Sequence, residues 1–332
     1  MDRIYLGFDT SNYRTSAAAV NSRGEVIFSR ADLLDVRKGE RGLRQSEAFF
    51  AHSNRLPEMT AGLFGTADAA SVAAIGASSR PRRVEGSYMP CFLAGLNLAN
   101  ELGSALGVPV YQFSHQEGHA AAVLGDESDR VLFMHLSGGT TEFLICSPDE
   151  NGYDMHIAGG TKDISIGQLI DRTGVALGYS FPSGPYLDDI AYETLEAYDF
   201  SIARKDLPGC MPKIRLSDDG FFNLSGAETK MLRRIEGGIA DEDVRLMTAE
   251  LFISLTDLLY GAARVLAERH GAAGVYMAGG VASSRTVRKL ISLKEHSADI
   301  LFGAPELSGD NAAGAALLAR RAHETGKRIA GK

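Results

Sequence analysis

The sequence predicts a two-lobed α/β protein in which the second lobe repeats the plan of the first. Its 332 residues exceed the length at which a single hydrophobic core usually keeps growing, so two lobes are expected. Strand and helix patterns alternate along the chain, as they do in parallel or mixed α/β sheets. A strand, a small polar turn and a second strand span residues 4–20, and the same order returns over residues 131–145. We therefore expect a duplicated fold with lobes at 1–127 and 128–332.

The first lobe begins with an apolar strand at residues 4–9 and the polar turn Asp9-Thr10-Ser11-Asn12. This turn offers Asp9 and Ser11 to a phosphate or another polar ligand. The remaining elements of the lobe are predicted, in chain order, as strands at 16–20 and 26–28, a helix at 43–63, a strand at 72–76, a helix at 88–106 and a strand at 108–111.

Two histidines lie four residues apart where the last of these strands passes into a helix. His115 and His119 would lie on one helical face, close enough for both imidazoles to reach one cation. A zinc protease is not favoured, because Glu117 follows one position later than the general base of the His-Glu-x-x-His motif. The alternative is that both histidines only cap the helix and touch solvent. A third histidine, His52, is expected at the surface of the 43–63 helix.

The second lobe opens with a strand at 131–136, the turn Ser137-Gly138-Gly139-Thr140-Thr141 and a strand at 142–145. Glycine lets backbone N–H groups approach an anion without interference from a Cβ atom, as a phosphate-binding turn requires. A duplicated α/β fold usually places its ligand between its halves, so we expect a ligand cleft there.

Later segments add candidates for the same ligand. A buried strand at 274–278 ends at Gly279-Gly280 before a helix capped by Ser284, which would suit a nucleotide base or ribose. The last helix opens at Asp310, which is either its N-cap or a metal ligand. The other elements are expected as helices at 164–178, 186–197 and 241–270, with an irregular surface excursion at 198–220.

Composition excludes several classes of protein. The net charge of −8 argues against a DNA-binding protein, because phosphate neutralisation supplies most non-specific affinity; an RNA substrate would need a local basic patch or a partner subunit. The chain begins without a basic leader and has no run of about 18 uncharged apolar residues, so we expect a cytoplasmic protein with no membrane partner. Cys91, Cys146 and Cys210 form no Cys-x-x-Cys pair and are expected to be ordinary buried thiols.

Taken in order, these motifs resemble those of the tRNA N6-adenosine threonylcarbamoyltransferases, which belong to the actin, sugar-kinase and chaperone-ATPase superfamily. The resemblance implies that two-lobed fold, with a last helix that can pack back toward the N-terminal lobe. The segments that carry it are Gly7-Phe8-Asp9-Thr10-Ser11, His115 to His119, Ser137 to Thr141, Asp171, Pro182-Ser183-Gly184-Pro185, Leu224-Ser225-Gly226, Gly279-Gly280-Val281 and Asp310-Asn311.

The resemblance also implies a function and its ligands. The protein would transfer a threonylcarbamoyl group from its adenylate to N6 of the tRNA adenosine beside the anticodon. It would use one divalent transition metal, iron or zinc, held by His115, His119 and Asp310, with His135 where some members have a tyrosine ligand. Partner subunits would help to bind tRNA, and both a homodimer and a heterodimer remain open. An adenine nucleotide, such as ATP, AMP or the acyl-adenylate, would contact Asp9, Ser11, Ser137, Gly138, Gly139, Thr140, Asp171, Gly184, Gly279, Gly280 and Ser284.

The chain departs from the family pattern at four places, and no catalytic side chain is assigned. Tyr13-Arg14 stands where the family has an acidic pair, Gln168 replaces a glutamate, Glu228 replaces an apolar or basic residue, and Ser284 replaces an asparagine. These departures leave two alternatives open: a related carbamoyltransferase that acts on a hydroxyl or a cysteine, and a non-catalytic nucleotide-binding paralogue. We expect Arg14 to hold an anionic group, unless it points to solvent from a hairpin.

Overall fold

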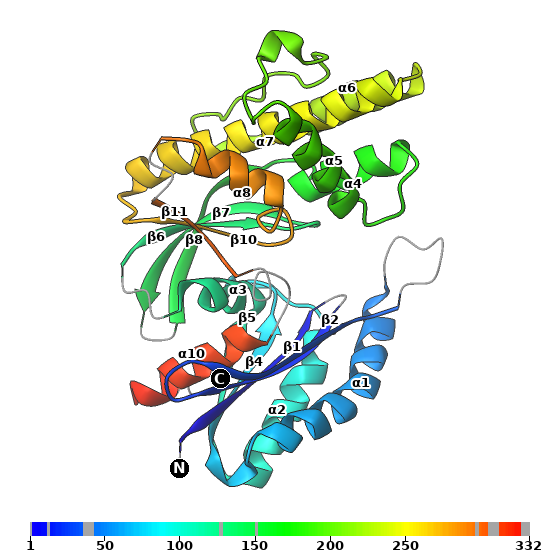
Figure 1. Ribbon diagram of the computed structural model, residues 1–332. Helices are drawn as coiled ribbons and strands as arrows, with labels where there is room; N and C mark the ends of the chain where they lie inside the picture. The colour runs from blue at the N-terminus through cyan, green and yellow to red at the C-terminus, as the bar shows by residue number, and fades with distance from the viewer. Residues whose placement is uncertain are drawn as a thin grey trace. The chain divides into compact units, whose positions relative to one another are not determined.

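The computed structural model describes residues 2–11, 14–35, 43–125, 129–149, 152–295, 299–304 and 312–326. The chain forms two compact units, which we describe separately (Figure 1). Unit 1 contains Met1–Ser128, Ser147–Met155 and Glu306–Lys332, and unit 2 contains Asp129–Cys146 and His156–Pro305. Two segments that follow residue 128 thus belong to unit 1.

In the described part of unit 1, five strands form one sheet in the order β3-β2-β1-β4-β5. The first three form an antiparallel meander, and β4 and β5 extend it in parallel with β1. The strands are β1 (Ile4–Ser11), β2 (Arg14–Asn21), β3 (Val26–Leu33), β4 (Val72–Arg80) and β5 (Val110–Ser114).

Alternation along β1 assigns its two faces. Leu6 and Phe8 belong to the core cluster beneath helices α1 (Gln45–Thr66) and α2 (Phe92–Leu106), so Gly7 and Asp9 point to the other face. That second face is covered by α10 (Ala313–Glu324), which also packs on α3 (His115–Leu124) (Figure 1).

Close packing of α10 depends on positions without side chains. A Cβ atom added to Gly7 would lie 2.2 Å from the Ala312 oxygen, and one added to Gly314 would lie 1.8 Å from the Gly118 oxygen. Real Cβ atoms essentially never come so close to backbone atoms, so any larger residue would push α10 away from β1 and α3.

Unit 2 repeats the sheet of unit 1. Over its described residues the order is β11-β10-β6-β7-β8-β9, so β8-β7-β6-β10-β11 matches β3-β2-β1-β4-β5 strand for strand. This match confirms the predicted duplication. The strands are β6 (Val131–Leu136), β7 (Thr141–Asp149), β8 (Gly152–Thr161), β9 (Phe221–Phe222), β10 (Val275–Ala278) and β11 (Ile300–Phe302).

The helices of unit 2 enclose a large apolar core. Its longest helix, α7 (Asp241–His270), is apolar enough to cross a membrane by composition, but 67% of that stretch is buried inside the protein. It packs on β6 and on neighbouring helices, so it is a core helix. The other helices are α4 (Ile166–Ala176), α5 (Gly184–Ala197), α6 (Ser225–Glu236) and α8 (Arg285–Ser292); short 3-10 helices occur at Ala69–Ser71 in unit 1 and Arg204–Asp206 in unit 2.

The structure corrects the sequence predictions for the 198–220 excursion and for His52. The excursion at 198–220 is anchored, because the buried Glu250 carboxylate of α7 accepts the backbone N–H groups of Cys210 and Met211. The surface position expected for His52 is wrong: its side chain is fully buried, and its Nδ1 lies 2.8 Å from Thr15 Oγ1. A hydrogen bond between the imidazole and a strand hydroxyl satisfies one ring nitrogen, so α1 can bury the His52 side chain against β2.

Candidate functional site

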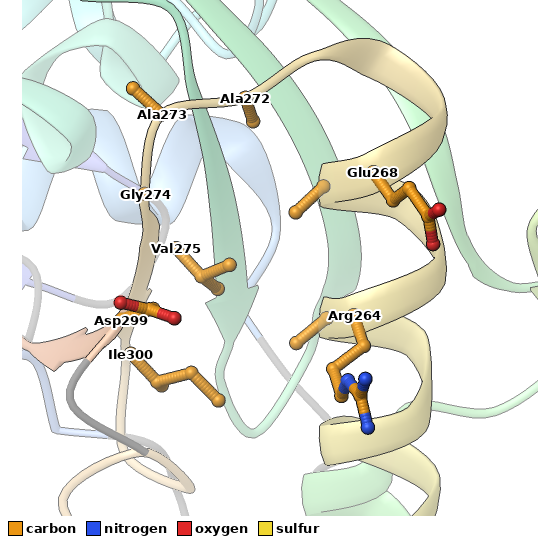
Figure 2. Close-up of a pocket in the computed structure, with 10 residues that line it drawn as sticks. Arg264, Glu268, Ala272, Ala273, Gly274, Val275, Asp299 and Ile300 are labelled. Atoms are coloured by element: carbon orange, nitrogen blue, oxygen red, sulfur yellow. The ribbon is translucent and has the colours of Figure 1, made fainter. Parts of the chain in front are cut away.

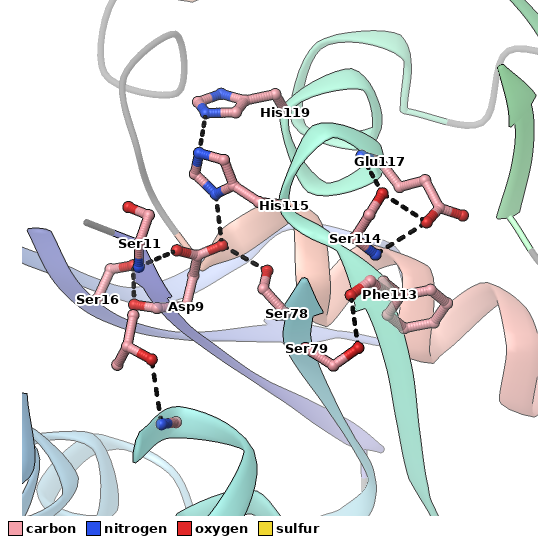
Figure 3. Close-up of polar contacts among 12 residues, drawn as sticks. Asp9, Ser11, Ser16, Ser78, Ser79, Phe113, Ser114, His115, Glu117 and His119 are labelled. Atoms are coloured by element: carbon pink, nitrogen blue, oxygen red, sulfur yellow. Dashed lines mark hydrogen bonds and ion pairs between the residues drawn. The ribbon is translucent and has the colours of Figure 1, made fainter. Parts of the chain in front are cut away.

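The two histidines and Asp9 form one linked group in unit 1. His115 Nδ1 lies 2.8 Å from Asp9 Oδ2, and His119 Nε2 lies 3.0 Å from His115 Nε2 (Figure 3). Asp9 is 1% exposed, and it also accepts hydrogen bonds from the Ser11 N–H and the Ser78 hydroxyl. A carboxylate so placed would hold the His115 ring in one orientation and keep the proton on Nδ1.

Local structure explains how residues so distant in sequence meet. Strands β1 and β5 flank β4, so Asp9, Ser78 and Ser114 all lie at the carboxyl edge of the same sheet. Ser114 caps α3, since its hydroxyl accepts the Glu117 N–H while the Glu117 carboxylate accepts the Ser114 N–H (Figure 3). The cap starts the helix at His115 and puts His119 one turn later on the same face.

The imidazole pair fits a divalent metal ion. If both Nε2 atoms bound one ion at about 2.0–2.1 Å, their 3.0 Å separation would give an angle of about 95° at the ion. The rings meet edge to face at 81°, and a proton on Nδ1 leaves the Nε2 lone pair of His115 available. Among the residues that the structure describes, no group of three or more potential ligands is assembled. The predicted third ligand, Asp310, lies outside those residues.

The alternative interpretation, that the histidines are solvent-facing caps, is wrong. His119 is only 4% exposed, and the cap of α3 is made by Ser114 and Glu117. The tentative fourth ligand, His135, lies on β6 in unit 2, is 7% exposed and stacks on Phe133. Whether His135 joins the other two histidines stays a prediction.

The predicted phosphate turn in unit 2 keeps open space around its glycines. Gly138 and Gly139 are exposed, and a Cβ atom added to either would meet nothing within 4 Å. Below them, α4 approaches so closely that a Cβ on Gly167 would lie 2.5 Å from the Gly138 Cα atom. The turn is fixed by a hydrogen bond of 3.0 Å from the Thr140 N–H to Ser137 Oγ. It is therefore a rigid backbone loop with room for an anion.

Gly279 belongs beside this turn. Its φ of +106° and the 2.3 Å between an added Cβ and the Leu136 oxygen both require glycine. The Val281 N–H donates to the same Leu136 oxygen, which ties the end of β10 to the start of the Ser137 turn. Gly280 has open space around it. The structure therefore brings Ser137–Thr140 and Gly279–Gly280 together at one end of the sheet.

The other predicted nucleotide contacts already have protein partners. Asp171 Oδ1 accepts the N–H groups of Ser183 at 2.8 Å and Gly184 at 2.9 Å, so Asp171 fixes the start of α5. Ser284 caps α8 and donates its hydroxyl to Asp188 at 2.5 Å. A ligand at these positions would use the remaining oxygen of Asp171 or displace an existing bond. Asp188, which neither propensity nor motif singled out, also accepts the Arg285 and Thr286 N–H groups.

Two departures from the family pattern have local structural explanations. Gln168 forms a capping box with Ser165 at the start of α4, a role that glutamine and glutamate share. Glu228 on α6 forms an ion pair with Arg172 of α4 at 2.9 Å. Both side chains therefore have a structural role in unit 2, and their effect on the acceptor stays a prediction.

A surface pocket of unit 2 lies away from these residues. It is lined by the end of α7 and by the starts of β10 and β11, including Arg264, Glu268 and Asp299 (Figure 2). Gly279 follows the opposite end of β10. The pocket is therefore separate from the candidate nucleotide site, and we assign it no function.

Comparisons with known proteins agree over nearly the whole chain. The profile of the tRNA N6-adenosine threonylcarbamoyltransferase family matches residues 27–317. The Staphylococcus carnosus (strain TM300) protein with this name is 26% identical over 98% of this chain and 93% of its own. The Streptococcus pneumoniae (strain ATCC 700669 / Spain 23F-1) protein is 25% identical over 94% of this chain and 90% of its own.

Solved structures show the same fold at low identity. Component A of (R)-2-hydroxyglutaryl-CoA dehydratase from Acidaminococcus fermentans has a TM-score of 0.52 at 17% identity, covering 98% of this chain and 100% of that chain. HypF from T. kodakarensis has a TM-score of 0.52 at 15% identity, covering 97% of this chain and 48% of that chain. Together with the duplicated sheets, these matches confirm the predicted actin, sugar-kinase and chaperone-ATPase fold.

Proposed function

Because the chain belongs to the tRNA N6-adenosine threonylcarbamoyltransferase family, we propose that it transfers a threonylcarbamoyl group from its adenylate to N6 of the tRNA adenosine beside the anticodon. Family membership supports a transferase that acts on tRNA. The observation that carries the finer proposal is the Asp9–His115–His119 group, whose geometry suits one metal ion.

In this proposal the two histidines of α3 in unit 1 are the first metal ligands. His115 and His119 would each bind through Nε2, and Asp310 and His135 would complete the set around iron or zinc. When bound, the ion would polarise the carbamoyl carbonyl and neutralise charge on the departing phosphate. Asp9 orients His115 and would keep its Nδ1 proton in place throughout the reaction.

Unit 2 would bind the adenylate. The Ser137–Thr140 turn would place its backbone N–H groups on the phosphate, and Gly279 and Gly280 would let the base or ribose approach the backbone. Asp171 and Gly184, already joined by a hydrogen bond, would form a polar edge for the ribose.

The chain's thiols do not supply a nucleophile. All three cysteines are buried, and burial raises the pKa of Cys91 to about 11 and that of Cys146 further still. The attacking group would therefore be the amine of the acceptor itself, acting on an activated mixed anhydride. Such a protein would work in the cytoplasm, with partner subunits to present the tRNA and either a homodimer or a heterodimer as the working form.

Reconstitution tests the proposal directly. The purified protein would be incubated with threonylcarbamoyl-adenylate, any partner subunits and a tRNA transcript with adenosine beside its anticodon, and the nucleosides would be analysed by mass spectrometry. We expect the modified adenosine in wild type and at least a 100-fold lower yield in His115→Ala/His119→Ala. A matched variant, His156→Ala/His270→Ala, changes another pair of neighbouring histidines and should retain activity. Full activity without His115 and His119 would contradict the metal-dependent mechanism.

A second candidate keeps the transfer chemistry but changes the acceptor. The observation in its favour is Arg14, at the start of β2, whose buried Nε atom has no hydrogen-bond partner within the described structure. A guanidinium that binds an anionic acceptor would satisfy that atom. Product formed on a small hydroxyl or thiol acceptor, but not on tRNA, would support this candidate. Loss of that product in Arg14→Glu would assign Arg14 to binding of the acceptor.

A further inference from the structure

The excursion between α5 and α6 exposes positive charge that the described acidic residues do not balance. In the segment of residues 209–217, exposure alternates from residue 212 on: Lys213, Arg215 and Ser217 face solvent, and Ile214 and Leu216 pack on the core of unit 2. This extended segment contains two basic residues and no acidic one. Two exposed side chains two residues apart on such a segment lie about 7 Å from each other.

Helix α6 adds two more cations next to this segment. Lys230 and Arg233 are exposed and lie three residues apart, so they share one face of the helix. Lys230 Nζ donates to the Gly209 oxygen at 2.7 Å, which fixes the start of the segment beside α6. We call the group of Lys213, Arg215, Lys230 and Arg233 the basic strip.

None of the four cations of the basic strip pairs with an acidic side chain in the described part of the chain. Glu228, on the same helix, is already paired with Arg172 at 2.9 Å. The arrangement is unusual for a protein whose net charge is −8. Exposed cations without acidic partners are the groups that release counterions when they meet a polyanion.

The arginines of residues 80–83 provide a contrast in unit 1. Arg83 forms an ion pair with Asp149 at 2.8 Å and lies 3.5 Å from the Glu117 carboxylate. Carboxylates therefore already pair with Arg83, and a phosphate at that residue would have to displace them. The basic strip needs no such exchange.

We propose that the basic strip is a docking surface for the phosphate backbone of tRNA. The inference rests on the proposed function, because it takes tRNA as the polyanion. It supplies the local basic patch that an acidic chain needs to bind RNA. The strip holds the nucleic acid through charge and carries no sequence information, since phosphate contacts position a substrate and do not specify it.

The test is tRNA binding measured by fluorescence anisotropy over a range of salt concentrations. The main variant is Lys213→Glu/Arg215→Glu, which spares Lys230 because that residue also anchors the loop. Its control, Arg23→Glu/Arg245→Glu, changes the net charge by the same amount at two exposed arginines elsewhere. We expect the main variant to bind tRNA at least about 10-fold more weakly, with a salt slope shallower by about one to two units. The control should bind as wild type does.

Two further measurements separate this proposal from the proposed function. Lys213→Gln/Arg215→Gln should give an intermediate loss, and Lys213→Arg/Arg215→Lys should retain affinity, which excludes a mere loss of folding. Calorimetry with AMP should give the same affinity in all variants. Unchanged tRNA binding in the main variant would overturn the basic strip and leave the proposed function standing, with an acidic protein partner as the alternative occupant. A wild-type protein that binds AMP but not tRNA would likewise overturn the basic strip, while the proposed function is decided separately by the reconstitution assay with partner subunits.

Discussion

The two units present equivalent polar turns that suit ligands of opposite charge. Asp9 lies near the carboxyl end of β1, and Ser137 follows β6, the equivalent strand of a second sheet with the same strand order. At the first, a buried carboxylate is bonded to His115 and would support a cation. At the second, exposed glycines stand in open space and would accept an anion. The comparison teaches that the duplicated topology sets the place in each sheet where a ligand would bind. One or two side chains then determine which ligand charge that place would suit.

Removing the imidazoles should have the largest effect on this comparison. We expect wild type to carry about one transition-metal ion per chain and His115→Ala/His119→Ala to carry less than about a tenth of that, because a carboxylate alone holds first-row cations weakly. Elemental analysis of the purified proteins measures it. The His156→Ala/His270→Ala protein should keep its metal. Equal metal content in both double variants would contradict a cation site at His115 and His119 in unit 1.

Adding a carboxylate to the second turn should reverse its preference for anions. Gly139→Asp introduces a side chain where a Cβ meets no atom, so the fold should tolerate it. Repulsion of the phosphate should weaken AMP or ATP binding about 30- to 100-fold in calorimetry. Gly65→Asp, also in open space but on α1, should bind the nucleotide normally. A normal affinity in Gly139→Asp would place the phosphate elsewhere.

Neutralising Asp9 should weaken the metal site without abolishing it. Asp9→Asn keeps the size of the side chain but loses the charge that orients His115, so metal affinity should fall about 10- to 30-fold. Competition with a chelator of known affinity measures the change. Asp163→Asn is the control in unit 2: its carboxylate caps α6, and backbone N–H donors lower its pKa to about 2 despite the opposing effect of burial. That variant should lose stability and keep metal affinity.

The smallest effect on this comparison concerns the buried His52, which interacts electrostatically with Asp9. Burial lowers the pKa of His52 to about 4 from an ordinary value near 6.5. As the pH falls, His52 therefore takes up a proton in the unfolded protein before it does so in the folded protein. Stability should be full above pH 6.5 and should fall by up to about 3 kcal/mol as the pH approaches 4. In urea unfolding, the free energy of unfolding should depend less on pH in His52→Gln than in wild type. His270→Gln should behave as wild type does.

The sequence predicted the fold best where hydrophobic patterns are continuous. The strands β1, β6 and β10 are apolar runs that end in polar or glycine turns, so the hydrophobic pattern was sufficient to predict them. It was insufficient for β8, whose residues alternate poorly, and for β11, which has three residues. Helix α6 was also missed, because its polar sequence buries only Ala227 and Met231. Short or polar elements depend on tertiary packing that local pattern does not encode.

Site prediction followed the same division. The spacing of His115 and His119 was enough to predict a shared face, because four residues make about one helical turn. The bond between Asp9 and His115 joins residues 106 apart across β4, and no local pattern reports it. Alternation in β1 was a usable signal, since Asp9 must face away from the core that holds Phe8. The Ser284–Asp188 bond and the burial of His52 depend in the same way on contacts between distant elements.

The packing of α10 has a consequence for how the protein is made. The helix that carries His115 and His119 lies against Gly314, which is synthesised after all of unit 2. Domains usually fold in the order of their synthesis, N-terminal first. Here unit 1 must wait with one face of its sheet uncovered until all of unit 2 has been translated. A metal site on α3 would therefore gain its packing against α10 only after unit 2 has been translated. A nascent chain stopped before residue 312 would present its histidines on a helix that lacks its neighbour.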